Sequence, residues 1–536
     1  MPASHQLGVI TCGSLAEGLH ARLEGSESVE DMRVGKFVVI EGQKHAFFSM
    51  VTDVVLEATN QKVLSDPPNG DQFIHEVLAG TSTYGSIEIK PMLMLPHDLT
   101  EGLLPVKTVP RHFAKVFDAK EKDFHRVFGD EDTTHFEIGR PLDMDVPVCL
   151  DLTKLVERSN GIFGKSGTGK SFLTRLLLCG TIKSKVASNL IFDMHSEYGH
   201  DAYSESGTFV KGLRQLFGSQ VLVYSLDPAS SRSRGVAIDE EVVIGLDQIE
   251  VGDVELLKDE LNLNPTAAES AYLLVDRFKD GWLQALLDMD ATAIKDFAET
   301  AGAHAGAISA LKRKLEQVAR KGFVKEKAST SAIERMIDAL ANGRHVVLEF
   351  GRYGDSLSYM LVANIITRRI HRRWVEQTNQ FIRTKNAADR PRQLMITIEE
   401  AHKFLNLATA KQTIFGTIAR ELRKYSVTLL VVDQRPSSID AEVMSQLGSR
   451  VTALLNDEKD IDAVFTGVSG SSSLKSVLAS LDTRQQAMIL GHAVPMPVVI
   501  RTRPYDTAFY TAIGHHALTL ETRKQALAEM DELFPD

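Results

Sequence analysis

GKSGTGKS, residues 164–171, is the stretch that decides the fold of this chain of 536 residues. It follows the apolar run NGIF, residues 160–163, and precedes FLTRLLLCG, residues 172–180, whose composition favours a helix. Glycines allow successive backbone N–H groups to turn inward around a phosphate, and a helix that begins there adds the positive end of its dipole. Strand, loop and helix in this order predict a P-loop in an α/β fold; the alternative is a glycine-rich turn that binds no nucleotide.

The P-loop pattern gives each position of the stretch an expected role. Lys170 is expected to contact the β and γ phosphates of ATP, and Ser171 to bind Mg²⁺. ATP and Mg²⁺ are therefore the predicted cofactors. The residues of the loop predicted to bind the nucleotide are Gly164, Lys165, Ser166, Gly167, Thr168, Gly169, Lys170 and Ser171.

A second acidic motif lies in LMITIEEAH, residues 394–402. An apolar strand ends there in Glu399 and Glu400, and α/β folds bind their ligands at the carboxyl ends of parallel strands. Glu399 is predicted to hold Mg²⁺ through water, and Glu400 to polarise the water that attacks the γ-phosphate. Taken alone, the pair fits a solvated acidic strand end; with a P-loop upstream, hydrolysis is the preferred interpretation.

Two further strand ends carry polar groups. VTLLVVDQRP, residues 427–436, places Asp433 and Gln434 where a side-chain amide can sense the γ-phosphate or orient water, unless they only form a turn before Pro436. DMHSEY, residues 193–198, follows another strand, either as part of the site or as a loop with satisfied polar groups. Both segments are therefore expected near the nucleotide.

Basic residues follow the acidic pair in IARELRKY, residues 418–425. A guanidinium from a neighbouring subunit can neutralise charge on the transferred phosphoryl group, so Arg420 and Arg423 are candidate arginine fingers. Taken by itself, the segment fits a solvated helix face better. The same interpretation is preferred over phosphate contacts for residues 367–373 and for the basic residues within 312–321.

The pattern along the chain predicts several parts. Short β-rich runs from Leu7 to about Leu95 indicate a small barrel or sandwich, and buried-looking strands that alternate with helical segments indicate a parallel sheet. The predicted parts are an N-terminal β-barrel with its linker at 1–140, a nucleotide-binding core at 141–250, a helical insertion of about four helices at 251–342, the continuation of the core at 343–510 and a C-terminal helix at 511–536.

Composition limits the classes of function. The formal net charge of −11 argues against a surface that coats nucleic acid indiscriminately, so DNA would need a local basic zone. Three cysteines are too few and too far apart for a disulfide framework or a metal cluster, and they fit a reducing cytosol. No leader pattern precedes the first strand, and no apolar stretch approaches the roughly 20 residues that cross a bilayer, so we expect a cytoplasmic protein without a membrane anchor.

The motifs and their order resemble the HerA family, hexameric ATPases of the FtsK/HerA class of P-loop NTPases. The segments that carry the resemblance are GKSGTGKS, DMHSEY, ITIEEAHKF, IARELRKYSVTLLVVDQRPSSID and ILGHAVPMPVVIRTRP. The N-terminal LGVITCGSLAEGLHARL and VGKFVVIEG resemble the small β-barrel of that family. The resemblance implies an α/β fold with a RecA-like P-loop ATPase core, an N-terminal β-barrel and a helical insertion.

The resemblance also implies roles for individual residues. It matches Lys170 and Ser171 to the Walker A site, Glu399 and Glu400 to the Walker B acids, Gln434 to the sensor, and Asp193 with Glu197 to the acidic motif after the second strand. Arg423 best matches the trans-acting arginine, and Arg420 is the reserve. Two positions depart from the family: Glu399 replaces the commoner Asp, and Ser196 stands where Gly is often found.

The function implied by the resemblance is that of an ATP-driven translocase or helicase on double-stranded DNA, working as a homo-hexameric ring. A NurA-like nuclease or another effector subunit is the expected partner, in DNA-end processing or antiphage defence. A ring would focus a few basic residues into one channel despite the acidic exterior. The alternatives are a motor that acts on protein and a nucleotide-gated hexameric scaffold that assembles and regulates an effector protein.

Overall fold

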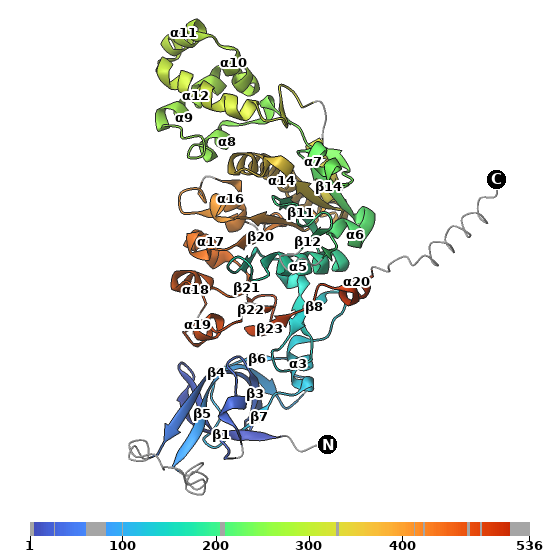
Figure 1. Cartoon of the computed structure of the whole chain (residues 1–536), viewed down its shortest axis with the longest axis vertical. Helices are drawn as coiled ribbons and strands as arrows, with labels where there is room; N and C mark the ends of the chain where they lie inside the picture. The colour runs from blue at the N-terminus through green and yellow to red at the C-terminus, as the bar shows by residue number, and fades with distance from the viewer. Residues whose placement is uncertain are drawn as a thin grey trace, which may run out of the picture.

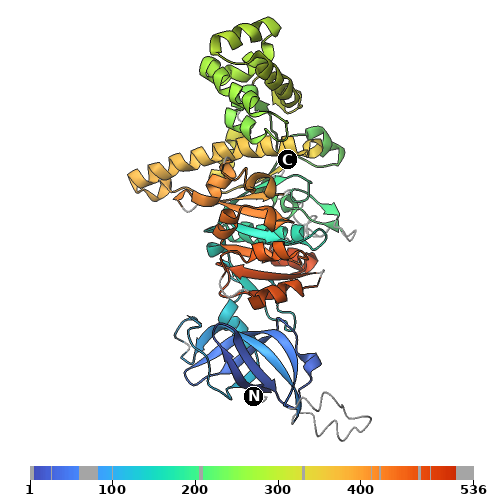
Figure 2. The same ribbon diagram turned by 90° about the vertical axis from the view of Figure 1, so that its left-hand side faces the viewer.

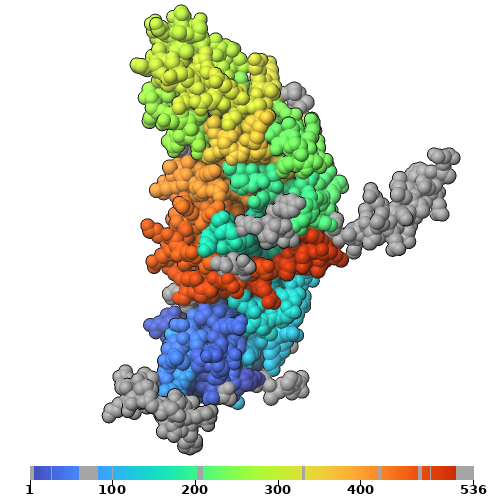
Figure 3. Space-filling view, in the orientation of Figure 1, coloured from blue at the N-terminus to red at the C-terminus, as the bar shows by residue number. Residues whose placement is uncertain are grey.

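The computed structural model describes residues 5–25, 27–59, 82–98, 100–203, 209–328, 332–411, 413–421, 424–468, 472–482 and 485–514. The molecule is elongated, with a barrel at one end, a large sheet in the middle and a helical insertion at the other end (Figure 1, Figure 2). The space-filling view shows these parts stacked along the long axis (Figure 3). The P-loop stretch lies in the middle part, between the two outlying domains.

The N-terminal part is a closed barrel of six strands. They run in the order β2 (Gly18–Leu23), β1 (Gln6–Ser14), β7 (Lys115–Asp118), β3 (Phe37–Glu41), β4 (His45–Ala58) and β5 (Thr83–Pro96), and β5 pairs back onto β2. The short β6 (Leu104–Pro105) pairs with β5. Ile87 and Ile89 are fully buried whereas Glu88 and Lys90 are partly exposed, as expected for a strand with one face on a core. The structure thus decides between barrel and sandwich in favour of the barrel.

The middle part is built on one sheet in which the structure describes twelve strands. Eight successive neighbours are parallel: β15 (Glu240–Glu241), β14 (Val221–Ser225), β18 (His345–Glu349), β11 (Ser188–Asp193), β19 (Leu394–Glu399), β20 (Val427–Asp433), β10 (Asn160–Phe163) and β21 (Ser449–Thr452). Four antiparallel strands continue it: β22 (Gln486–Gly491), β23 (Val498–Thr502), β8 (His135–Arg140) and β9 (Val148–Asp151). The central parallel strands are buried along their whole length, as strands covered on both faces must be. The predicted α/β class is confirmed.

The barrel ends earlier than the sequence pattern indicates. The pattern predicts residues 1–140 as barrel and linker, but β8 pairs with β23 at the far edge of the central sheet. The pairing is favourable because Phe136 and Ile138 are buried in the main hydrophobic core, with exposed fractions of 1% and 0%. Residues 135–140 therefore belong to the sheet.

The helical insertion has five α-helices among its described residues, where the pattern predicts about four. They are α8 (Val251–Leu256), α9 (Pro265–Phe278), α10 (Trp282–Asp288), α11 (Ala291–Ala301) and α12 (Ala305–Ala319). Lys279, at a φ of 52°, ends α9 and separates it from α10. α13 (Ala332–Ala341) falls in the predicted insertion at 251–342, but it packs on β18 and β11 of the sheet and buries Met336 and Leu340 there. The insertion therefore ends before α13.

A long helix, α14 (Ser356–Thr384), joins the sheet to the insertion (Figure 2). Arg368 donates a hydrogen bond to the buried Asp253 of α8 at 2.8 Å, and Arg372 donates to both carboxylate oxygens of Glu250 at 2.9 Å. Asn364 donates to the other oxygen of Asp253 at 2.6 Å. The basic stretch 367–373, predicted as a solvated face, is thus partly an ion-paired junction with the insertion.

The last described helix is α20 (Thr507–Ala512). Most of the C-terminal helix predicted at 511–536 lies outside the described residues, which end at 514. Within the described ranges, we find no helix that is both long and apolar enough to cross a bilayer.

Candidate nucleotide-binding site

The stretch 164–171 forms a tight turn between β10 and α5 (Lys170–Ser184). Gly164, Gly167 and Gly169 have φ angles of 155°, 77° and 92°, which L side chains rarely adopt. A Cβ on Gly164 would lie 2.7 Å from Thr168 Oγ1 and 2.9 Å from Ala453 Cβ. The glycines of the motif are therefore required by the backbone path itself.

The turn fits a phosphate group. Gly169 is the N-cap residue of helix α5 and provides no side chain to cap it, so the N–H groups of the first turn can bind an anion. Lys170 Nζ donates to Lys165 O at 2.9 Å, which folds the ammonium group over the loop. Ser171 stands next to Lys170 at the start of the same helix and is partly exposed. The loop therefore offers N–H donors, a cation and a hydroxyl at one place.

Carboxylates end three neighbouring strands of the sheet. Asp193 is the last residue of β11, Glu399 of β19 and Asp433 of β20. β10, which leads into the P-loop, pairs beside β20 with Phe163 opposite Asp433. Because these strands are parallel, their carboxyl ends and the P-loop share one edge of the sheet. The structure thus brings together there the Walker A loop and the acidic residues predicted from three separate motifs.

Glu399 is buried, with one carboxylate oxygen bonded and the other unpaired. Its Oε1 accepts a hydrogen bond from the Tyr198 hydroxyl at 2.7 Å, and its Oε2 is buried without a hydrogen-bond partner among the described residues. Burial, with the Asp193 carboxylate nearby, raises the pKa of Glu399 to about 8. A divalent cation beside Oε2 would favour the charged carboxylate, so this oxygen fits Mg²⁺.

Glu400, the next residue, lies at the surface of the same edge. Its backbone has a φ of 49°, a left-handed conformation that persists for a non-glycine residue only where its surroundings fix it. Its Oε1 accepts from Gln434 Nε2 at 3.4 Å, and its Oε2 lies 3.9 Å from His402 Nε2. The Glu400 side chain is 30% exposed, so water can reach the carboxylate.

Asp433 fixes the turn that follows β19. One of its carboxylate oxygens accepts from the His402 backbone N–H at 2.7 Å and lies 3.0 Å from His402 Nδ1. The other accepts from the Arg435 N–H at 2.8 Å. The hydrogen bond to Asp433 raises the pKa of His402. Of the pair at the end of β20, Gln434 therefore faces Glu400, while Asp433 holds the turn.

Asp193 faces its own loop. Its carboxylate accepts from the N–H groups of Glu197 and Tyr198, both at 2.8 Å, and of Gly199 at 3.3 Å. Burial raises the pKa of Asp193 to about 6. The Glu197 side chain is partly exposed. Nucleotide contacts by Asp193 and Glu197 stay a prediction; the contact described is the one that shapes the loop 193–199.

Of the two candidate arginine fingers, the structure describes Arg420 but not Arg423. Arg420, on α16 (Ile414–Glu421), donates to Ala410 O at 2.8 Å and lies 3.9 Å from Glu442 Oε2. Arg423 lies outside the described residues.

Three residues that the motifs did not assign make hydrogen bonds to residues of the site. They are Tyr198, Tyr359 and Arg175. The Tyr359 hydroxyl, on α14, accepts from Glu399 N and donates to Glu399 O, both at 3.1 Å. Arg175, on α5, donates through Nε to Glu197 O at 3.1 Å. Of the three, only Tyr198 could have been found from the sequence, because it is the last residue of the motif DMHSEY. Arg175 and Tyr359 lie in helical segments without a recognised motif around them.

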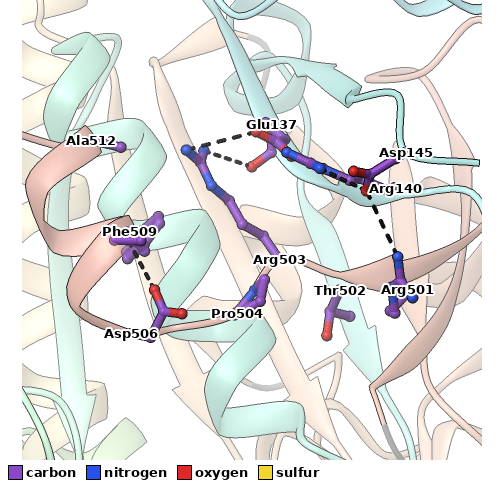
Figure 4. A pocket seen from close by; sticks show the side chains of 11 residues that line it. Glu137, Arg140, Asp145, Arg501, Thr502, Arg503, Pro504, Asp506, Phe509 and Ala512 are labelled. Carbon is purple, nitrogen blue, oxygen red and sulfur yellow. Dashed lines mark hydrogen bonds and ion pairs between the residues drawn. The ribbon is translucent and has the colours of Figure 1, made fainter. Parts of the chain in front are cut away.

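A pocket of about 480 Å³ lies elsewhere, between β8, β23 and α20 (Figure 4). Its basic side chains are paired: Arg140 with Asp145 at 2.7 Å and with Glu137 at 2.9 Å, and Arg503 with Glu131 at 3.1 Å. None of the predicted nucleotide-binding residues lines it, so the site is assigned to the sheet edge and not to this pocket.

A phosphate cradle, an unpaired buried carboxylate oxygen and a water-accessible carboxylate at one sheet edge form the site of a P-loop ATPase. Two family models match the chain in tandem: a HAS barrel domain over residues 7–107 and the central domain of helicase HerA over residues 136–370. Together they match more than half of the chain. The chain belongs to the HerA family.

Some relatives match along most of their length. A probable helicase of Methanocaldococcus jannaschii is 24% identical over 500 residues, which are 89% of this chain and 87% of the relative. A protein named DNA double-strand break repair helicase HerA, from Sulfolobus acidocaldarius, is 24% identical over 89% of this chain and 90% of the relative. Among solved structures, the bacterial conjugative coupling protein TrwB is similar with a TM-score of 0.46 and 12% identity, over 72% of this chain and 92% of that one.

Proposed function

We propose that this protein is an ATP-dependent translocase or helicase on double-stranded DNA. The observation that supports the proposal most is the set of groups for ATP hydrolysis at one sheet edge, Lys170 with Glu399, Glu400 and Gln434. The family context supplies the substrate class, because the Sulfolobus acidocaldarius relative, matched over 90% of its length, is named a DNA double-strand break repair helicase.

In this proposal each group has one task. The P-loop N–H groups and Lys170 bind the β and γ phosphates, while Ser171 and Glu399 Oε2 hold Mg²⁺. When bound, Mg²⁺ neutralises charge on the phosphate oxygens. Glu400 takes the proton of the attacking water, and the amide of Gln434 orients the Glu400 carboxylate.

The proposed assembly is a homo-hexamer in which a neighbouring subunit completes each site with an arginine. The guanidinium of Arg420 is already bonded to Ala410 O within its own subunit, so Arg423 is the better candidate for this role. A ring also reconciles DNA binding with a net charge of −11, because six copies of a few basic residues add up in one channel.

Mixing subunits tests the arginine directly. Arg423→Ala and Lys170→Ala rings should each hydrolyse little ATP, but a mixture should recover part of the rate at interfaces that combine an intact P-loop with an intact arginine. If this mixture recovers no ATPase activity, but a mixture of Arg420→Ala and Lys170→Ala subunits does, the role of the trans-acting arginine belongs to Arg420.

The proposed partner is a NurA-like nuclease or another effector subunit, and the proposed setting is DNA-end processing or antiphage defence in the cytoplasm. These proposals rest on the family to which the chain belongs.

The decisive experiment is steady-state ATP hydrolysis with and without linear double-stranded DNA at low salt. Lys170→Ala should abolish hydrolysis. The matched control is Lys122→Ala, because Lys122 is an exposed lysine of α3 (Glu121–Phe128), the helix that follows the last barrel strand. We expect strong stimulation by DNA in the wild type and in the control. Hydrolysis that is indifferent to DNA would favour a protein-directed motor or a nucleotide-gated scaffold.

A further inference from the structure

Tyr198 connects the loop after β11 to the carboxylate at the end of β19. Its hydroxyl donates to Glu399 Oε1 at 2.7 Å, across 201 positions of sequence, and both side chains are buried, with exposed fractions of 0% and 7%. Glu399 Oε2 has no hydrogen-bond partner among the described residues. The Tyr198 hydroxyl thus occupies one oxygen of the carboxylate and leaves the other free.

The loop that carries Tyr198 is in turn bonded to the P-loop helix. Arg175, which is 3% exposed, donates through Nε and Nη2 to the carbonyl of Glu197, the residue before Tyr198. Its guanidinium also lies 6.0 Å from the centroid of the Tyr198 ring. Arg175 follows Ser171 by four positions on α5, and side chains with this spacing share one face of a helix.

A continuous set of contacts therefore joins the two residues expected to hold Mg²⁺. Ser171 and Arg175 are on one helix, Arg175 binds the carbonyl of Glu197, and Tyr198 binds Glu399. The Asp193 carboxylate stiffens this connection, because it binds the N–H groups of both Glu197 and Tyr198 at 2.8 Å.

We propose that Tyr198 is a positioning residue for the magnesium ion, because its hydroxyl fixes the Glu399 carboxylate in the orientation that leaves Oε2 free for the ion and its hydration shell. The proposal rests on the proposed metal role of Glu399. Hydrogen bonds to a metal-binding carboxylate commonly act in this way, and their loss costs about 10–100-fold in metal affinity or activity.

Tyr198→Phe is the informative variant. It keeps the ring that packs beside Arg175 and removes only the hydroxyl, which leaves Glu399 Oε1 buried without its donor. Tyr359→Phe is the matched control, because Tyr359 is equally buried and its hydroxyl binds the Glu399 backbone instead of the carboxylate.

The measurement is binding of a fluorescent ADP analogue at a series of Mg²⁺ concentrations, without turnover and without DNA. For Tyr198→Phe we expect the Mg²⁺ concentration at half-saturation to rise about tenfold or more, while ADP affinity in EDTA stays at the wild-type value. For Tyr359→Phe we expect a shift of less than about threefold, because the carboxylate keeps its donor.

A double-mutant cycle with Glu399→Gln separates positioning from general loosening of the fold. Where the side chain at 399 no longer carries a charge for the ion, adding Tyr198→Phe should change the Mg²⁺ dependence no further. Equal shifts in Tyr198→Phe and Tyr359→Phe, additive effects in the cycle, or a wild-type Mg²⁺ dependence in Tyr198→Phe would each overturn the proposal.

The experiment also distinguishes this proposal from the proposed function. Wild-type nucleotide binding that does not respond to Mg²⁺ would overturn the metal site itself, and with it the role of Tyr198. DNA stimulation does not enter the measurement, so the positioning role stands or falls independently of translocation.

Discussion

Gln434 Nε2 lies 3.4 Å from Glu400 Oε1 and joins the ends of the adjacent strands β19 and β20. Glu400, the proposed proton acceptor, is thus in contact with the Gln434 amide, which is proposed to orient the Glu400 carboxylate. Since Glu400 also has a left-handed backbone, its position depends on both the turn after β19 and the end of β20.

Replacing Glu400 with Gln should separate ATP binding from hydrolysis. Loss of a general base lowers rates by about 100-fold or more, while the phosphate cradle is untouched. We therefore expect single-turnover hydrolysis to collapse and affinity for an ATP analogue to stay within about twofold. Glu376→Gln, at an exposed position of α14, should match the wild type in both assays. Near-normal hydrolysis in Glu400→Gln would move the base elsewhere.

Replacing Gln434 with Ala should slow hydrolysis by about tenfold or more without weakening ATP binding, because it removes a donor that orients the Glu400 carboxylate. Gln434→Glu should be worse, since it brings a second carboxylate within hydrogen-bonding reach of Glu400. Gln446→Ala, an exposed glutamine of α17 (Ala441–Gln446), is the control. A Gln434→Ala protein that binds ATP poorly but hydrolyses what it binds at the normal rate would contradict the role.

Asp193 and Glu399 should contribute stability to the metal-free protein that is lost as pH rises from about 4 to about 8. Burial raises the pKa of Asp193 to about 6 and that of Glu399 to about 8, so between their unfolded and folded pKa values the folded protein holds more protons. The stabilisation is complete below the unfolded values and is lost as pH rises through the folded ones. Glu399→Gln should flatten the dependence of the thermal unfolding midpoint on pH in EDTA, and an unchanged slope would show that Glu399 does not cause it.

The junction between α14 and the insertion should depend on Arg368 far more than on Arg372. Arg368→Ala leaves the buried Asp253 without its cation, a change that costs about 3–5 kcal/mol in comparable buried pairs. Arg372→Ala breaks a pair in which both side chains are about half exposed, which is worth about 1 kcal/mol or less. Thermal unfolding should show a clearly lower midpoint for the first and a small change for the second. Equal effects would mean that Asp253 is satisfied by Asn364 alone.

The parts of the site that the sequence predicts are those whose geometry is local. The glycines of 164–171, the acidic pair at 399–400 and the pair at 433–434 each follow directly from a strand, and parallel strands bring their ends to one edge. The P-loop and the α/β class are visible for this reason, whereas the pattern of the N-terminal strands leaves barrel and sandwich open. Specific nucleotide contacts of the individual residues stay predictions.

The parts that the sequence does not predict depend on distant pairings. β8 pairs with β23, with Arg140 opposite Arg501, and the Tyr198 hydroxyl binds Glu399 across 201 positions of sequence. No local pattern marks either contact. The sequence predicts a solvated helix face for the basic stretch 367–373, because its acidic partners Glu250 and Asp253 lie more than a hundred positions earlier. A helical period likewise cannot say whether a helix, such as α13, packs on the insertion or on the sheet.

Helix α14 links the nucleotide-binding edge of the sheet to the helical insertion. Tyr359, near its start, makes hydrogen bonds to the backbone of Glu399, and Arg368, farther along, makes a hydrogen bond to Asp253 in the first helix of the insertion. These residues are nine positions apart, or about 14 Å along the axis. The 29 residues of α14 include neither glycine nor proline, the usual causes of a sharp bend. The helix therefore forms one continuous connection between the strand end that carries Glu399 and the first helix of the insertion.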